Sequence, residues 1–296
     1  EIIIGDDYSS DGTREVLQYY QQRYPEIIQL ILHPRRYDCI PGRINNITNL
    51  YACRGKYVAM LDGDDYWIST DKLQIQVDFL DQNPEYALTF NDTKVISAEN
   101  GFTEYYHSDH FYMLKKRRDF DHNDIAKNWF IATSSMVFRN GLIKEFPEWF
   151  WKVYSADYAI QLLVTESGMV KYFPELKSVW RKHQTSFTIL NNITLKDSKL
   201  RVDELLMFRS NFMSFRPLGV VNYRLAIFYR KHAQLLREHR YYFSMLYYYI
   251  RSSHMYLIHY SLKYLMKTNK HLKNKRNHIF RFISNEALLR KSNEKS

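Results

Sequence analysis

The sequence predicts an α/β fold, in which a mostly parallel sheet is flanked by helices and followed by a separate helical region. Over roughly the first 190 residues, short apolar runs of strand length alternate with segments of helical spacing, an order typical of parallel βαβ units. From about residue 195 onward, turn residues become sparse and long helical stretches dominate. We therefore expect a domain over residues 1–194 and a helical appendage over residues 195–296.

The N-terminal segment predicts the first βαβ unit. An apolar run precedes Asp6 and Asp7, and a helix begins near Thr13, a favourable N-cap residue, and ends before Pro25. A second apolar run covers residues 27–32. Ligands of parallel sheets bind outside the carboxyl ends of the strands. Asp6 and Asp7 are therefore candidate site residues.

A further apolar run, residues 57–61, is followed by three carboxylates within four residues, Asp62, Asp64 and Asp65. Three unpaired negative charges in one turn repel one another, and a hard divalent cation is their usual partner. An acidic turn that caps the following helix gives the same local pattern. Because this cluster and the first Asp pair both follow predicted strands, we expect them to share one site.

The remaining expected elements follow from the same periodicity and from their flanking breakers. They are helices over 43–54, 70–83 and 156–163, a strand over 86–90, and a turn and strand over 168–173.

With both Asp segments in place, the chain resembles the family 2 glycosyltransferases over roughly residues 1–190. A strand ending in Asp-Asp before the Ser-x-Asp-Gly-Thr turn at residues 9–13 is similar to part of that family's nucleotide pocket. The Asp-x-Asp at 62–64 is similar to its metal motif. The resemblance implies the GT-A fold, a nucleotide-diphospho-sugar transferase fold with a Rossmann-like, mostly parallel sheet. Because residue 1 is a glutamate within a strand, we expect the first strand and helix of that sheet to precede it.

The resemblance implies roles for the carboxylates at the strand ends. Asp7 contacts the nucleobase and Asp6 lines the same nucleotide-sugar pocket. Asp62 serves the ribose and diphosphate as well as the metal, and Asp64 holds the metal, Mn²⁺ or Mg²⁺. Asp65 serves either the metal or the acceptor.

The helix over 43–54 contributes two more candidates for nucleotide-sugar binding. Asn45 matches a recurrent Asn on the family's helix before the metal motif, and Arg43 is placed to face the nucleotide. A solvent-facing helix residue is the alternative interpretation of Asn45.

Two further residues match the family's catalytic and metal positions. Asp157 matches the position of the general base, although an Asp at a helix start also favours the helix dipole without any catalytic role. His183 ends a segment similar to the family's Tyr-Arg-x-His, with Trp180 in place of Tyr. A metal or diphosphate contact and a structural role are both open for His183.

The resemblance implies that the acceptor side lies around Ser135, in a strand over 134–140 that is similar to the family's acceptor-side strand. Trp149 and Trp151 follow within an aromatic cluster. Aromatic faces stack on sugar C–H surfaces, but core packing is the alternative for at least half of this cluster.

The charge is distributed unevenly along the chain. Residues 196–296 carry 21 basic and 6 acidic residues, whereas the remainder is net negative. The Tyr-rich segment 240–267 has no uninterrupted apolar run of spanning length, so it predicts an interfacial helix at an anionic membrane, or a helix packed on the domain. Only two Cys occur, which favours a reducing, cytoplasmic location. The basic, Tyr-rich tail predicts a peripheral position at the inner face of the membrane.

The resemblance implies an inverting, metal-dependent glycosyltransferase acting on a nucleotide-sugar donor and a glycan or lipid-linked glycan acceptor, in surface polysaccharide or glycolipid biosynthesis. The processive members' Gln-x-x-Arg-Trp motif is absent from the sequence, which favours single addition. The alternatives are a non-catalytic sugar-nucleotide-binding relative or inactive fragment, and a nucleic-acid binder using the basic tail. The tail contains no recognisable reader motif, so we expect no nucleic-acid partner.

Overall fold

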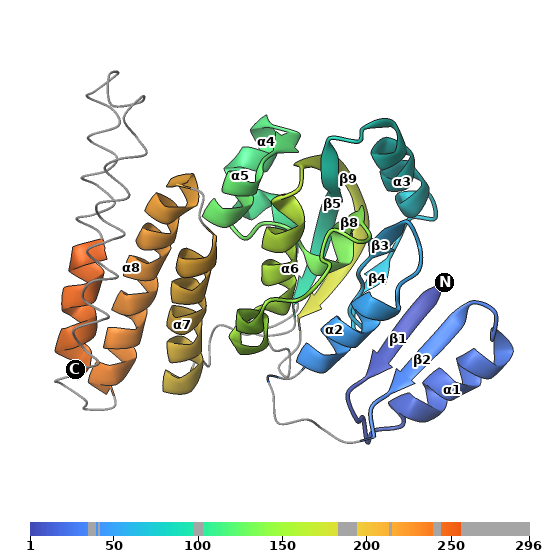
Figure 1. Cartoon of the computed structure of the whole chain (residues 1–296), viewed down its shortest axis with the longest axis horizontal. Coiled ribbons are helices and arrows are strands. Elements are labelled where there is room, and N and C mark those ends of the chain that lie inside the picture. The colour runs from blue at the N-terminus through green and yellow to red at the C-terminus, as the bar shows by residue number, and fades with distance from the viewer. Residues whose placement is uncertain are drawn as a thin grey trace. The chain divides into compact units, whose positions relative to one another are not determined.

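The computed structural model describes residues 1–34, 40, 42–97, 103–182, 194–212, 215–238 and 244–255. The chain divides into two compact units, Glu1–Ile193 and Thr194–Ser296 (Figure 1). The strands are β1 (Ile2–Asp6), β2 (Ile28–Leu32), β3 (Tyr57–Ala59), β4 (Tyr66–Trp67), β5 (Tyr86–Ser97), β6 (Thr103–Tyr106), β7 (Asp119–Phe120), β8 (Met136–Arg139) and β9 (Met169–Lys182). The helices are α1 (Thr13–Arg23), α2 (Arg43–Ala52), α3 (Lys72–Gln82), α4 (Tyr112–Lys116), α5 (His122–Lys127), α6 (Ala156–Thr165), α7 (Leu195–Asn211) and α8 (Phe215–Glu238). Short 3-10 helices cover His107–His110, Thr133–Ser135 and Glu148–Lys152.

The predicted N-terminal βαβ unit is confirmed. Strands β1 and β2 pair in parallel, and α1 packs on β2 while α2 packs on β1 (Figure 1). Helix α1 begins at Thr13 as expected, but Gly12 rather than Thr13 is its N-cap. Gly12 has φ 90°, which a glycine adopts without strain. The Asp11 carboxylate then accepts hydrogen bonds from the Thr13 N–H and hydroxyl.

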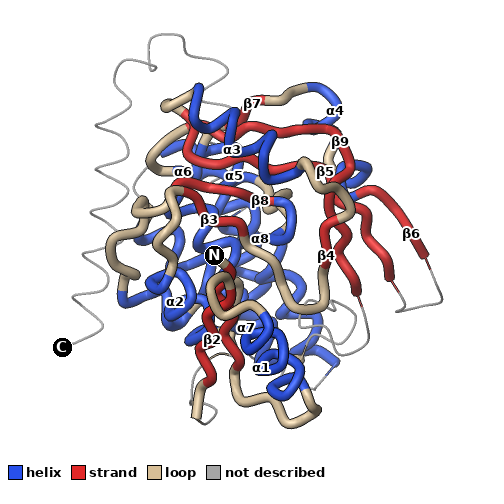
Figure 2. The backbone as a smooth tube through the Cα atoms, turned by 90° about the vertical axis from the view of Figure 1, so that its right-hand side faces the viewer, coloured by secondary structure: helices blue, strands red, loops and turns tan. Residues whose placement is uncertain are grey.

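The large sheet has the order β3-β8-β5-β9-β4, with β6 paired to β5 and β7 paired to β9. Strands β5 and β9 run parallel, whereas the other pairs in this sheet are antiparallel. It is therefore mixed rather than mostly parallel, partly because β8 inserts antiparallel between β3 and β5. Helices α3 and α6 cover its two faces (Figures 1 and 2). The apolar core between these layers includes Leu88, Phe90, Val137 and Ile160, each at most 1 % exposed.

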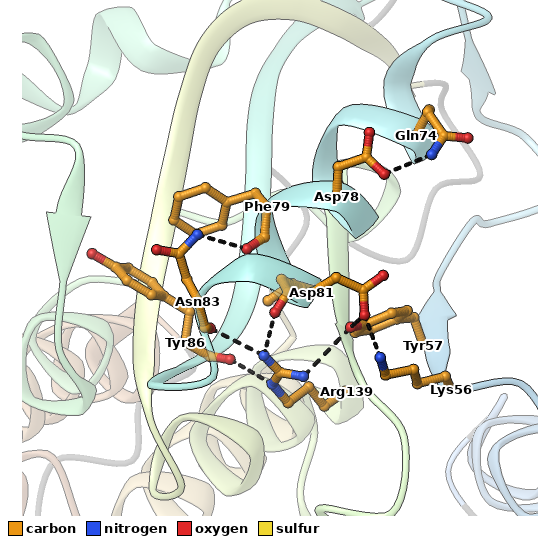
Figure 3. Close-up of polar contacts among 10 residues, drawn as sticks. Lys56, Tyr57, Gln74, Asp78, Phe79, Asp81, Asn83, Tyr86 and Arg139 are labelled. Carbon is orange, nitrogen blue, oxygen red and sulfur yellow. Dashed lines mark hydrogen bonds and ion pairs between the residues drawn. The ribbon is translucent and has the colours of Figure 1, made fainter.

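Arg139, at the end of β8, joins this strand to the connection between α3 and β5. Its guanidinium donates to the carbonyl oxygens of Tyr86 at 2.8 Å, Leu80 at 2.5 Å and Asn83 at 3.0 Å (Figure 3). These carbonyls lie at the end of α3 or just after it, where helical partners are missing. One side chain therefore donates to three backbone carbonyls at the end of α3 and just after it.

Gly168 lies where the chain passes from α6 to β9, close against the start of β5. A Cβ at this position would lie 2.6 Å from the Glu85 carbonyl oxygen and 3.0 Å from the Ala87 nitrogen, both backbone atoms. We expect Gly168→Ala to lower the free energy of unfolding by about 1–3 kcal/mol, because the backbone must shift. Urea unfolding measures the change. Gly63→Ala is the control, since a Cβ there meets nothing within 4 Å, and equal losses in the two variants would contradict the packing argument.

The C-terminal unit is helical in its described part. Helix α7 begins with a capping box in which the Thr194 and Asp197 side chains each bond the other residue's backbone N–H. Helices α7 and α8 pack against each other, and residues 244–255 are also helical. Among the described residues, none of the helices has the length and apolar character needed to cross a membrane.

Candidate active site

Asp6 and Asp7 lie at the end of β1, as expected, but they have different surroundings. Asp6 is 4 % exposed, and its carboxylate accepts from the Ser9 N–H at 3.0 Å and from Arg14 Nε at 2.5 Å. Burial opposes ionisation of Asp6, but the hydrogen bonds from Ser9 and Arg14 outweigh it and lower the pKa of this carboxyl. In this structure, Asp6 therefore holds the turn that follows β1.

The Asp7 carboxylate has one engaged and one open oxygen. Its Oδ2 accepts from the Gly42 N–H at 3.3 Å. Its Oδ1 is buried and has no hydrogen-bond partner among the described residues. An unpaired buried acceptor is unfavourable unless a ligand donates to it.

Helix α2 brings Arg43 and Asn45 to the same region. The Asn45 amide donates to the Gly5 carbonyl at 3.2 Å, so this side chain faces β1 and is not solvent-facing. Arg43 is 1 % exposed, and its Nη2 donates to the Val153 carbonyl oxygen before α6.

The acidic turn between β3 and β4 is held in place by β9. The Asp65 N–H donates to the Asp62 carbonyl oxygen at 3.0 Å, which closes the turn. The Arg181 N–H donates to Asp65 Oδ1 at 3.0 Å, and Arg181 Nε donates to the Asp64 carbonyl oxygen. Asp65 is thereby buried, whereas Asp62 remains open to solvent at its surface. The predicted strand over 57–61 ends at Ala59, so the turn begins earlier than expected.

The three carboxylates of this turn repel one another, and the carboxylate of Asp157 repels Asp62 as well. The surrounding protein, and then the negative charges of Asp157, Asp65 and Asp64, raise the pKa of Asp62 to about 7. Burial raises the pKa of Asp65 to about 6, although the Arg181 N–H opposes the shift. The site therefore concentrates negative charge that a cation would relieve.

Asp157 lies in the first turn of α6, and its charge acts on the acidic turn. Its Oδ2 accepts a hydrogen bond from the Thr133 hydroxyl at 3.1 Å. Burial raises the pKa of the Asp157 carboxyl, while the Tyr158 N–H, the Thr133 hydroxyl and the charge of Arg43 oppose the rise. A carboxylate with a raised pKa is a better proton acceptor than an ordinary Asp.

The expected acceptor-side residues are distributed between the core and the surface. Ser135 is fully buried, and its hydroxyl donates to the Ala132 carbonyl at 2.7 Å. In this structure, Ser135 is therefore a packing residue with no surface toward an acceptor. Trp151 is 41 % exposed, Trp149 is half-buried, and Phe150 between them is fully buried. Trp151 is thus the side chain of this cluster that a sugar ring could reach.

The sequence interpretation missed the supporting residues Thr133 and Ser134. The Thr133 hydroxyl donates a hydrogen bond to Asp157, and the Ser134 side chain opposes the rise in the pKa of Asp65. The Thr-Ser-Ser run before β8 was their only local signal. His183 lies outside the described residues. Among the described residues, no group of three or more His, Cys, Asp or Glu side chains is arranged to hold a metal ion.

A buried lysine lies beside the site. Lys72 is 0 % exposed, its ammonium lies 4.6 Å from the centre of the Trp67 ring, and it donates to Gln76 Oε1 at 2.9 Å. Burial lowers the pKa of Lys72 from 10.5 to about 7. Between these two values the unfolded chain binds more protons than the folded chain. The free energy of unfolding therefore rises with pH from about 7 toward 10.5.

We expect Lys72→Met to remove this part of the pH dependence. The wild-type free energy of unfolding should rise faster than that of the variant above pH 7, by at most about 1.4 kcal/mol per pH unit. Urea unfolding of both proteins between pH 7 and pH 9 measures the difference. Parallel curves would show that the Lys72 proton is not coupled to folding.

Comparisons with known proteins agree with the predicted resemblance. The chain is 33 % identical over 184 residues to the uncharacterized protein Mb1547 of Mycobacterium bovis, which covers 62 % of this chain and 50 % of that protein. It is 24 % identical over 234 residues to the UDP-Glc:alpha-D-GlcNAc-diphosphoundecaprenol beta-1,3-glucosyltransferase WfgD of Escherichia coli, covering 79 % and 83 % of the two chains. The chain spans about half the length of the first of these relatives.

Among solved structures, S. aureus TarS 1-349 aligns over 89 % of this chain and 82 % of that chain, with a TM-score of 0.47 and 16 % identity. Residues 1–146 match the model of glycosyl transferase family 2. Together with the mixed α/β sheet, this match confirms the α/β class and the GT-A fold expected from the sequence. Residues 1–146 of the chain therefore belong to glycosyl transferase family 2.

Proposed function

We propose that the protein transfers a sugar from a nucleotide-diphosphate sugar to an acceptor hydroxyl, with inversion at the anomeric carbon. One observation carries this proposal beyond family membership. The fold brings the Asp157 carboxylate close enough to the acidic turn for its charge to raise the pKa of Asp62. This effect supports one site that contains both a candidate base and a candidate diphosphate-binding turn.

Inverting sugar transfer requires both a base and a group that binds the diphosphate. The acceptor oxygen forms a bond to the anomeric carbon while the bond from that carbon to the diphosphate oxygen breaks. The acceptor proton passes to the Asp157 carboxylate, and the nucleoside diphosphate leaves with the electron pair. A hydroxyl is a poor nucleophile, so a positioned base lowers the barrier. A single displacement of this kind inverts the configuration.

The acidic turn fits a divalent cation bound together with the donor. Mg²⁺ is usually held by one or two carboxylates plus substrate phosphate oxygens rather than by a complete protein cage. Burial and the negative charges of Asp157, Asp65 and Asp64 raise the pKa of Asp62, and such an ion would relieve the repulsion among these charges. Asp62 and Asp64 would hold Mn²⁺ or Mg²⁺. When bound, the ion would stabilise negative charge on the leaving diphosphate.

Asp7 is the proposed contact for the nucleobase. The buried Oδ1 offers an acceptor without a partner among the described residues, and a base N–H or amino group can donate to it. Its other oxygen is held by the Gly42 N–H, which fixes the carboxylate. Asn45 and Arg43 lie on the same helix, and a nucleotide-sugar contact remains a prediction for Asn45.

The proposed acceptor is a glycan or a lipid-linked glycan, reached over the exposed Trp151. The name of WfgD describes transfer to a diphosphoundecaprenol-linked sugar. We propose the same broad class here, with single addition in surface polysaccharide or glycolipid biosynthesis.

A donor screen tests the proposal. The complete protein is incubated with individual nucleotide sugars and Mn²⁺, and release of nucleoside diphosphate is measured with and without a lipid-linked glycan acceptor. We expect release that depends on one donor and that stops in EDTA. Donor binding without release in the presence of acceptors would favour a non-catalytic sugar-nucleotide-binding protein.

We also propose that the C-terminal unit binds an anionic membrane surface at the cytoplasmic face. Three large apolar residues of the 244–255 helix are exposed, Leu246 at 54 %, Tyr247 at 51 % and Ile250 at 61 %. They belong to a region with 21 basic and 6 acidic residues. Apolar side chains can enter the headgroup region while basic residues meet anionic lipids, each contributing on the order of 1 kcal/mol.

We expect the protein to pellet with phosphatidylglycerol-containing vesicles at low salt, and less as salt rises, because screening weakens the attraction. Leu246→Ser combined with Ile250→Ser should reduce pelleting without changing the charge. Equal pelleting with neutral and anionic vesicles, or none at low salt, would contradict membrane binding.

A further inference from the structure

Arg43, the first residue of α2, is a buried cation whose contacts reach the start of α6. Its Nη2 donates to the Val153 carbonyl oxygen, and its guanidinium carbon lies 4.6 Å from the centre of the Phe150 ring. Val153 precedes Ser155, the N-cap of α6, and Asp157 lies in the first turn of that helix. The Arg43 side chain therefore joins α2 to the backbone segment that carries Asp157.

The residue before Arg43 reaches the other side of the site. The Gly42 N–H donates to Asp7 Oδ2 at 3.3 Å. Gly42 is the N-cap of α2 and has φ 73°, a left-handed conformation that glycine adopts without strain. Two consecutive residues at the start of α2 thus make contacts within the site. Gly42 contacts Asp7, the proposed nucleobase contact, and Arg43 contacts Val153, which lies shortly before the proposed base Asp157.

The burial of Arg43 is unfavourable unless its contacts compensate for lost hydration. A guanidinium is suited to this position, because it can stack on an aromatic ring and donate hydrogen bonds in fixed directions. Its positive charge also opposes the burial-driven rise in the pKa of Asp157. The site therefore includes the fixed positive charge of Arg43, which acts on Asp157.

We propose that Arg43 is a positioning residue for Asp157, which it holds through the Val153 carbonyl and the start of α6. The inference rests on the proposed glycosyl transfer and replaces the nucleotide-sugar contact expected for Arg43 from the sequence. A displacement of about 1 Å in a catalytic group can lower turnover on the order of 100-fold. Loss of Arg43 should therefore affect the chemical step more than donor binding.

The test compares Arg43→Met with wild type in the complete protein, with donor and acceptor each varied. We expect kcat to fall about 10-fold to 100-fold, while the donor KM changes little. Arg43→Lys keeps the positive charge but loses the planar guanidinium, so its kcat should lie between that of wild type and that of Arg43→Met. If the Met variant does not fold, the Lys variant gives the same kcat-against-KM comparison.

Arg139→Met is the matched control. Arg139 also donates to backbone carbonyls, those of Tyr86, Leu80 and Asn83, but outside the candidate site. We expect this variant to lower Tm and to leave kcat and the donor KM unchanged.

A double variant separates positioning from general structural support. In an Asp157→Asn background, Arg43→Met should cause no further loss of turnover, because the group that it positions is already absent. An equal loss in both backgrounds would overturn the proposal and make Arg43 a structural residue. A donor KM raised about tenfold or more with kcat retained would overturn it and make Arg43 a nucleotide contact. If the wild-type protein releases no nucleoside diphosphate with any donor, the proposed function itself fails and the inference fails with it.

Discussion

Asp157→Asn is expected to lower turnover by about two to four orders of magnitude while donor affinity is retained. The amide keeps the shape of the side chain and can still bond the Thr133 hydroxyl, but it cannot accept the acceptor proton. Removal of this carboxylate also removes one of the charges that raise the pKa of Asp62, so the donor site itself should not be weakened. Steady-state kinetics and donor titration calorimetry measure the two quantities separately.

The matched control for this variant is Asp121→Asn, at the N-cap of α5. Its carboxylate accepts from the Asp124 N–H at 2.9 Å, and Asn is an equally good N-cap residue. Turnover should therefore be unchanged. A parallel loss of donor affinity in Asp157→Asn would assign Asp157 to nucleotide or metal binding rather than to proton transfer.

Asp64→Ala is expected to abolish transfer and metal-dependent donor binding while the fold is retained. The structural contact of Asp64 with Arg181 uses the backbone carbonyl, which alanine preserves. The variant should therefore lose a proposed metal ligand without losing the bond that anchors the turn to β9. Circular dichroism checks the fold, and donor binding is titrated with Mn²⁺ and again in EDTA.

Asp78→Ala provides the comparison for Asp64→Ala. Asp78 is an exposed carboxylate on α3, bonded to Gln74 at 2.7 Å and outside the acidic turn (Figure 3). Activity and metal dependence should be unaffected there. Activity retained in Asp64→Ala, or in wild-type protein with EDTA, would exclude the proposed metal role.

The sequence predicts those features of the site that depend on residues adjacent in the chain. One apolar run ends in Asp6 and Asp7, and another ends before Asp62. Both runs place carboxylates at strand ends, whatever the positions of these strands in the sheet. What those carboxylates touch was not predictable in this way. Asp6 is held by Arg14 from the following helix, and only the folded turn shows that this carboxylate is occupied.

Long-range contacts explain the remaining differences. The bonds from Thr133 to Asp157 and from Arg43 to Val153 join segments that no local pattern relates. Burial also depends on long-range contacts. Ser135 and Trp151 are both plausible acceptor residues by type, but Ser135 is fully buried and Trp151 is exposed. The direction of β8 in the sheet likewise depends on tertiary pairing rather than on the spacing of apolar residues.

The hydrogen bond from the Arg181 N–H to Asp65 has a consequence for how the protein acquires its site during synthesis. The two residues are 116 positions apart, and such non-local contacts form late because the intervening chain must first be ordered. Domains fold as units while the chain is being made, at a rate of about 5–20 residues per second. A nascent chain that has emerged only through the acidic turn thus lacks both the β9 anchor and Asp157. The proposed metal-binding turn is present early in translation, but it reaches its final geometry only after β9 has been added to the sheet.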